Sequence, residues 1–150
     1  MTNDALVDAL NNLVTINNDR IQGFEKAADD IEDPQLASIF RNLTSQSRKF
    51  RSQLADDIGR MGGVVPGIEE TSTGSKIHRT WIDVKSTFTG KDRNSVLDSC
   101  VFGENSAVEE YEEVLEHDEI PSYLRDTLTA QLAELRQTRD QIVTMRDVTE

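Results

Sequence analysis

Four long segments of this chain repeat their apolar residues every three or four positions, and this spacing restricts the fold more than any other feature. Such spacing places the apolar side chains on one face of an α-helix. The segments span about residues 4–31, 34–62, 93–116 and 121–147. Because each apolar face must be buried against another element, the sequence predicts an all-α helical bundle.

The links between these segments determine how the helices are arranged. Asp33 suits an N-cap and Pro34 suits a first helical position, so the second helix follows the first almost directly. Pro121 opens the last helix after another short link, and short links make each pair an antiparallel hairpin. The connection between the hairpins has roughly 30 residues, enough to run the length of a bundle, and carries an extra short helix at about 76–88. We expect one domain, residues 1–150, with the up-down topology and long crossover of ferritin-like four-helix bundles.

Composition excludes several classes of protein. The net charge is −12, with 28 acidic and 16 basic residues, which argues against a nucleic-acid partner. A single cysteine cannot form an intrachain disulfide and favours a reducing compartment. The start of the sequence lacks the basic and apolar regions of a signal peptide, and no apolar run approaches the ~18 residues of a membrane span. We therefore expect an acidic cytoplasmic protein with no membrane partner.

Polar residues interrupt the apolar faces at similar depths in all four long helices. The predicted central polar cluster consists of Asn17, Ser47, Glu104, Tyr111, Thr138 and Arg139. A buried carboxylate is costly unless something satisfies it, so Glu104 is the residue that most needs an explanation. Three interpretations stay open: a residual metal ligand, a carboxylate paired with Arg139, and a partly solvated side chain at the edge of the apolar face.

Several short motifs together resemble a known family. They are Gly23-Phe24 with Ala27-Ala28, Asp33-Pro34, His78-Arg79-x-Trp81 with Lys85, Cys100-x-x-Gly103-Glu104, Tyr111-Glu112-Glu113 and Arg146-Asp147. In these motifs the chain resembles the bacterial ferritin-like four-helix-bundle proteins of unknown function, which are distant relatives of rubrerythrin and bacterioferritin. The resemblance covers almost the whole chain and implies a ferritin-like fold.

The metal ligands of iron-binding relatives are largely missing. Such proteins take a Glu from each of two helices and Glu-x-x-His from each of the other two. Here only Glu104 matches, and the equivalent of Glu104 in the first helix is Ile21, which cannot ligate. The second-helix pair falls near Ser47 and Phe50. The last-helix pair falls near Arg136 and Arg139, or one residue earlier at Leu135 and Thr138. We therefore expect a degenerate di-iron site, with no metal and no cofactor.

Three further residue groups have both a structural and a functional interpretation. Cys100 is either a small core residue or a redox-sensitive thiol. Tyr111 is either a core aromatic with a hydrogen-bonded hydroxyl or a redox tyrosine. The crossover motif of His78 and Trp81 favours packing by the indole and a structural hydrogen bond by the imidazole over metal ligation.

The leading hypothesis for function is a metal-free, non-catalytic ferritin-like protein. It would have a stress, housekeeping or interaction role, exerted through a protein partner or as a homo-oligomer. One alternative is an iron-dependent redox or peroxide-handling protein, which rests on analogy with the family. Another alternative is the binding of a small ligand in the bundle core.

Overall fold

The computed structural model describes residues 2–71 and 93–148, with no account of the side chains of Asp30 and Val148. Four helices make up most of this part of the chain: α1 (Asn3–Asp30), α2 (Pro34–Arg60), α4 (Arg93–Leu115) and α5 (Ser122–Val148). Each begins and ends within two residues of its predicted limits. The predicted helix at 76–88, with His78 and Trp81, lies outside the described residues.

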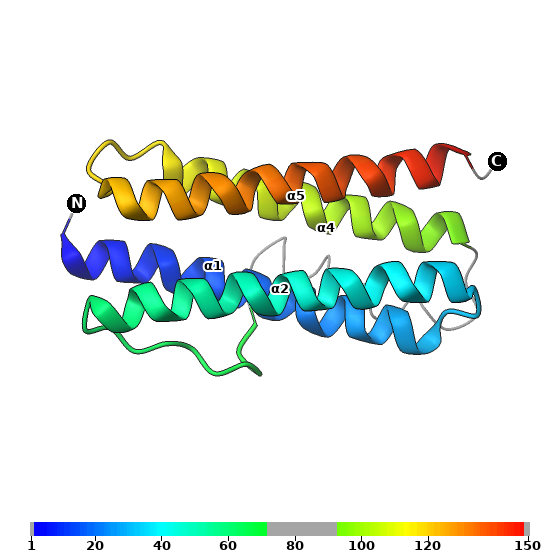
Figure 1. The fold of residues 1–150 in the computed structure, drawn as a ribbon, viewed down its shortest axis with the longest axis horizontal. Coiled ribbons are helices and arrows are strands. Elements are labelled where there is room, and N and C mark those ends of the chain that lie inside the picture. Colours follow the sequence, from blue (N-terminus) through cyan, green and yellow to red (C-terminus); the bar gives the residue numbers. More distant parts are fainter. Residues whose placement is uncertain (1, 72–92, 149–150) are drawn as a thin grey trace.

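The helices form two antiparallel hairpins that lie against each other (Figure 1). α1 packs on α2, and α4 packs on α5, while α4 also contacts α1 and α5 contacts α2. Each helix is antiparallel to both of its neighbours, as the predicted up-down order requires. No strand occurs within residues 2–71 and 93–148, so the predicted all-α bundle is confirmed. No helix in this part of the chain is long and apolar enough to cross a membrane.

The first hairpin turns where the sequence predicts a stop and a restart. The Asp33 carboxylate accepts hydrogen bonds from the backbone N–H groups of Gln35 (2.9 Å) and Leu36 (3.3 Å), and Pro34 takes the first helical position. After α2, Gly62 adopts a φ of +77°, a conformation that glycine takes without strain. The turns that the sequence predicted from proline and glycine thus define both ends of α2.

Residues 66–70 are held against the outer side of the first hairpin by two polar side chains. The amide nitrogen of Asn18 donates to the carbonyl oxygens of Gly67 (3.0 Å) and Glu70 (2.7 Å). Arg51 of α2 donates to Asn18 Oδ1 (2.8 Å) and to the carbonyl of Pro66 (2.7 Å). As a result α1 is buried on more than one side near its centre, where four consecutive polar residues, 17–20, are all buried.

Candidate functional site

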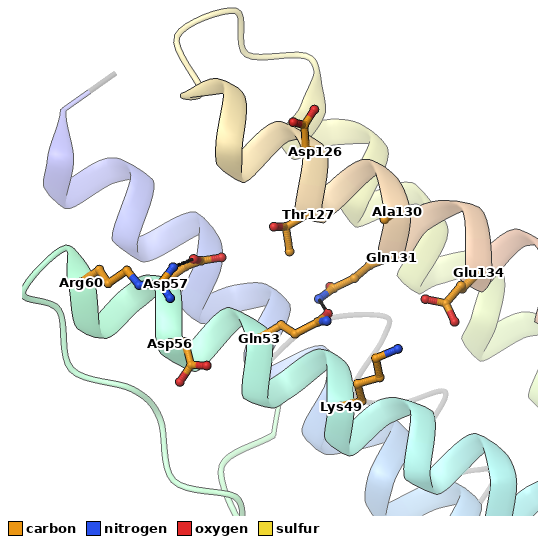
Figure 2. A pocket seen from close by; sticks show the side chains of 10 residues that line it. All are labelled: Lys49, Gln53, Asp56, Asp57, Arg60, Asp126, Thr127, Ala130, Gln131 and Glu134. Carbon is orange, nitrogen blue, oxygen red and sulfur yellow. Dashed lines mark hydrogen bonds and ion pairs between the residues drawn. The ribbon is translucent and has the colours of Figure 1, made fainter.

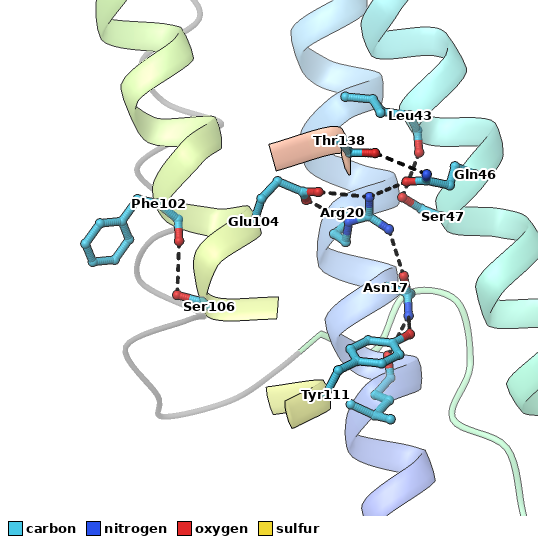
Figure 3. A network of polar contacts seen from close by, with 11 residues as sticks. Asn17, Arg20, Leu43, Gln46, Ser47, Phe102, Glu104, Ser106, Tyr111 and Thr138 are labelled. Carbon is cyan, nitrogen blue, oxygen red and sulfur yellow. Dashed lines mark hydrogen bonds and ion pairs between the residues drawn. The ribbon is translucent and has the colours of Figure 1, made fainter. Parts of the chain in front are cut away.

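An ion pair between α1 and α4 occupies the centre of the bundle (Figure 3). Arg20 Nε donates to Glu104 Oε1 at 2.8 Å, and Arg20 Nη2 donates to Glu104 Oε2 at 3.1 Å. Both side chains are 0% exposed. Two parallel bonds between a guanidinium and a carboxylate are the geometry in which this pair is strongest. The pair therefore satisfies the carboxylate that the sequence left unexplained.

The Arg20 guanidinium also makes hydrogen bonds and aromatic contacts besides those with Glu104. Nη1 donates to Asn17 Oδ1 at 3.0 Å, and Nη2 donates to Gln46 Oε1 at 2.7 Å. The guanidinium carbon lies 5.6 Å from the ring centroid of Phe24 and 5.7 Å from that of Phe50. Cations within about 6 Å of an aromatic ring face are attracted to it. Hydrogen bonds and aromatic rings thus enclose the buried cation.

Tyr111 extends this network away from the ion pair. Its hydroxyl accepts a hydrogen bond from Asn17 Nδ2 (2.9 Å) and donates to Gln131 Oε1 (2.6 Å). Burial raises the pKa of the Tyr111 hydroxyl, while the hydrogen bond from Asn17 and the charge of Arg20 lower it to a smaller extent. The phenol therefore keeps its proton and acts as a donor. The predicted hydrogen-bonded core tyrosine is what the structure shows.

The other predicted members of the cluster differ in their contacts. Thr138 accepts a hydrogen bond from Gln46 Nε2 at 3.2 Å, and so belongs to the network around Arg20. Ser47 is fully buried and donates to the carbonyl of Leu43, one turn earlier in α2, at 2.7 Å. Ser47 thus lies beside the network without a hydrogen bond to the ion pair.

Two interpretations of Glu104 were wrong. Arg139, the predicted partner, donates to Asn105 Oδ1 (3.4 Å) and Asp140 Oδ1 (3.2 Å), and its side chain is 28% exposed. The reason is helical geometry, because each residue turns the side chain by about 100°. Thr138 faces the core, so the residue after it faces the bundle edge. Partial solvation of Glu104 is also wrong, since its side chain is fully buried.

Arg20 was not predicted to belong to the central polar cluster, although its spacing could have revealed it. Arg20 follows Asn17 by three residues and precedes Phe24 by four, the spacing of one helical face. The neighbouring Ile21 was aligned with Glu104 because Ile21 follows Asn17 by four residues, as Glu104 follows Cys100. Arg20 was not counted, because a polar residue of this kind does not continue an apolar stripe. Gln131 was missed for the same reason, although it is 1% exposed and lies three residues after Leu128.

Cys100 lies in the core as a free thiol, one helical turn before Glu104. Burial raises the pKa of the Cys100 thiol, and the nearby negative charge of Glu104 raises it further. Because the thiolate is the reactive form, this environment supports the interpretation of Cys100 as a core residue.

The residues at the bundle centre do not fit a pair of metal ions. Both oxygens of Glu104 accept hydrogen bonds from Arg20, so this carboxylate is already paired with a cation that belongs to the protein. Within residues 2–71 and 93–148, no three or more His, Cys, Asp or Glu side chains are grouped so that they could hold a metal ion. A guanidinium cannot act as a ligand because it is always protonated and has no free lone pair.

A polar groove of about 500 Å³ lies between α2 and α5 (Figure 2). It is lined by Lys49, Gln53, Asp56, Asp57, Arg60, Asp126, Thr127, Ala130, Gln131 and Glu134. Gln131 Nε2 donates to Gln53 Oε1 at 2.9 Å, which joins the two helices across the groove. Asp57 is mostly buried, and this burial raises the pKa of its carboxyl; the charge of Arg60 lowers it and that of Asp56 raises it.

Comparison with solved structures shows the same fold in three bacterial proteins, each with a TM-score of 0.75. A conserved hypothetical protein from Mycobacterium tuberculosis is 15% identical, with 97% of this chain and 99% of that chain covered. A mutant of Dps1 from Mycobacterium smegmatis is 14% identical, with 96% of each chain covered. A dodecameric thioferritin from Bacteroides fragilis, described as bacterioferritin-related, is 18% identical, with 99% and 88% covered.

These neighbours confirm the predicted ferritin-like fold. A comparison with curated proteins gave no significant match. A family profile matches residues 5–117, which confirms the predicted resemblance to a ferritin-like family of unknown function. The chain belongs to the family described as domain of unknown function DUF2383.

Proposed function

We propose that this protein is a metal-free ferritin-like bundle that acts through its surface as a non-catalytic interaction module. The observation that carries the proposal is the Arg20–Glu104 pair. Its two hydrogen bonds, at 2.8 and 3.1 Å, engage the one carboxylate that matches the ligand pattern of iron-binding relatives. The cation that balances this carboxylate belongs to the protein, so the centre serves to hold the helices in register.

Self-association is the mode of interaction that we propose first. One structural neighbour, the Bacteroides fragilis protein, is described as dodecameric. The exposed faces of this bundle include Tyr123, 51% exposed, at the start of α5. A stress or housekeeping role in the bacterial cytoplasm, exerted as a homo-oligomer or through a protein partner, fits the bacterial sources of the neighbours and the single reduced cysteine.

Metal analysis tests the metal-free proposal directly. The protein would be purified without chelators, incubated anaerobically with Fe(II), desalted and analysed by plasma mass spectrometry. We expect far less than one iron per chain and no ferroxidase activity above the buffer rate. Two irons per chain would overturn the proposal and favour the iron-dependent alternative.

The Glu104→Gln variant is the matched control. Iron held at the bundle centre would require the Glu104 carboxylate and would be lost in this variant, whereas iron on surface carboxylates would remain. Light scattering coupled to size-exclusion chromatography tests the second part of the proposal. We expect a discrete assembly larger than one chain, and a monomer at all concentrations would remove self-association as the mode of action.

A further inference from the structure

A chain of hydrogen bonds connects the central ion pair with the groove between α2 and α5. It starts at Arg20 Nη1, which donates to Asn17 Oδ1 on the same helix at 3.0 Å. Asn17 Nδ2 donates to the Tyr111 hydroxyl of α4 at 2.9 Å, and that hydroxyl donates to Gln131 Oε1 of α5 at 2.6 Å. Gln131 Nε2 then donates to Gln53 Oε1 of α2 at 2.9 Å. This chain of hydrogen bonds includes side chains from all four helices that the structure describes.

The direction of this chain is determined at its start. A guanidinium only donates hydrogen bonds, so Asn17 must turn its oxygen toward Arg20 and its nitrogen toward Tyr111. The Tyr111 hydroxyl has one proton, which it gives to the oxygen of Gln131. The nitrogen of Gln131 is then left to donate to Gln53.

Two backbone carbonyl groups favour the same direction. A carbonyl only accepts, so each of them requires that the side-chain amide beside it present its nitrogen. Asn17 Nδ2 also donates to the carbonyl of Leu13 at 2.9 Å. Gln131 Nε2 also donates to the carbonyl of Phe50, at the longer distance of 3.4 Å. Every fixed donor and acceptor along the chain therefore agrees on one direction, and hydrogen bonds aligned in this way strengthen one another.

We propose that this chain of hydrogen bonds acts as one directional unit. The donor groups of Arg20 at its start determine which atom of each following side chain donates and which accepts, as far as Gln53 at the floor of the groove. This direction requires an acceptor at residue 53 toward the interior and leaves the amide nitrogen of Gln53 as a donor in the groove. Within the described residues, that nitrogen makes no further hydrogen bond. A group bound at the groove floor must therefore offer a hydrogen-bond acceptor.

The charges of the groove predict the opposite preference at residue 53. Its walls carry the carboxylates of Asp56, Asp57, Asp126 and Glu134 and the cations of Lys49 and Arg60. With four acidic and two basic groups, Coulomb interactions alone favour an added lysine over an added glutamate. The hydrogen-bond chain favours glutamate, whose carboxylate accepts from Gln131, whereas a lysine can only donate.

The test compares Gln53→Glu with Gln53→Lys by urea unfolding. We expect the unfolding equilibrium constant of the lysine variant to be about tenfold larger, because the buried Gln131 amide loses the nearer of its two acceptors and keeps only the Phe50 carbonyl at 3.4 Å. Glu and Lys have similar helix propensities, so this difference reports the hydrogen bond. Ala130→Glu and Ala130→Lys are matched controls on the groove wall outside the chain, where lysine should be tolerated at least as well. If the lysine variant at residue 53 is the more stable one, as Coulomb interactions alone predict, the proposal is overturned.

A second comparison asks whether the effect reaches beyond one local bond. Tyr111→Phe removes the shorter of the two contacts that orient Gln131 and leaves only the 3.4 Å contact with the Phe50 carbonyl, so Gln131 can turn over more readily and accept from a lysine at residue 53. In this background we expect the glutamate-to-lysine difference to fall below about threefold. If the stability difference between the glutamate and lysine variants is undiminished, the effect comes from the Gln131–Gln53 bond alone. That result would overturn the proposal that the chain of hydrogen bonds acts as one unit.

Amide exchange provides a measurement that needs no variant. In the wild-type protein, the side-chain N–H₂ protons of Gln131 should exchange slowly and those of Gln53 rapidly, as measured by NMR. Slow exchange of the Gln53 amide protons would mean that Gln53 donates toward the interior, and it would overturn the proposal even where the Tyr111→Phe variant fails to fold.

Discussion

Replacing Arg20 by methionine should destabilise this protein far more than any loss of surface charge. Within the described residues, the two oxygens of Glu104 accept hydrogen bonds only from Arg20 Nε and Nη2. The Arg20→Met variant would therefore leave a carboxylate that is 0% exposed without a donor or a counter-charge. Removal of one partner of a buried pair costs about 3–5 kcal/mol. We expect a loss of this size in the free energy of unfolding.

Two companion variants separate the pair from its surroundings. Glu104→Gln keeps an oxygen that can accept from Arg20, which also keeps its bonds to Asn17 and Gln46, so the loss should be smaller. The double variant Arg20→Met/Glu104→Met removes both charges and fills the space with apolar side chains. Because such replacements are often neutral or stabilising, it should recover most of the stability lost in Arg20→Met.

Urea unfolding followed by circular dichroism at 222 nm measures these free energies. The matched control is Arg136→Met, because Arg136 Nη2 and Glu112 Oε2 are 2.7 Å apart but their side chains are 47% and 46% exposed. This change should cost less than about 1 kcal/mol. A loss of that small size for Arg20→Met, with an unchanged denaturant slope, would refute the reasoning. So would a double variant no more stable than the single one.

Three further predictions concern the other groups of the bundle. Burial raises the pKa of the Asp57 carboxyl above its usual 3.8, so the contribution of this group to stability is full below pH 3.8 and is lost as the pH rises through the raised pKa. Asp57→Asn should remove this part of the pH dependence of urea unfolding, and an unchanged pH profile would contradict the prediction. Asp33→Ala should cost about 1 kcal/mol by removing the N-cap of α2, whereas Glu32→Ala, at an exposed position beside it, should have little effect in the same assay. The Cys100 thiol should react with an aromatic disulfide reagent only in urea, and stoichiometric reaction of the native protein would show that the core opens to solvent.

The sequence was informative about the backbone because the signals for helices are local. Periodic apolar residues, the Asp33-Pro34 pair and the glycines after α2 each act within a few residues of their position. Apolar burial is also insensitive to the identity of the partner, so the core positions follow from spacing alone. The lengths of the links then left the up-down bundle as the favoured arrangement.

The polar centre was only partly predictable. Asn17, Ser47, Glu104, Tyr111 and Thr138 were recognised because a polar residue on an apolar stripe stands out, and all five are buried. Arg20 was not recognised, because a charged side chain beside a stripe is ordinarily assigned to solvent. Arg139 was included in error, because a one-residue shift on a helix moves a side chain from the core to the edge.

The sequence by itself thus determined that four amphipathic helices form two hairpins, and that Glu104 needs a partner inside them. Only the tertiary structure decided which partner that is. A hydrogen bond requires that the distance between atoms on different helices be right to within a few tenths of an ångström, and the spacing of residues along the chain does not specify such distances. The choice of Arg20, with Glu104 at 2.8 Å and two phenylalanine rings around the guanidinium, follows from how α1 meets α4, which carries Glu104, and α2, which carries Phe50.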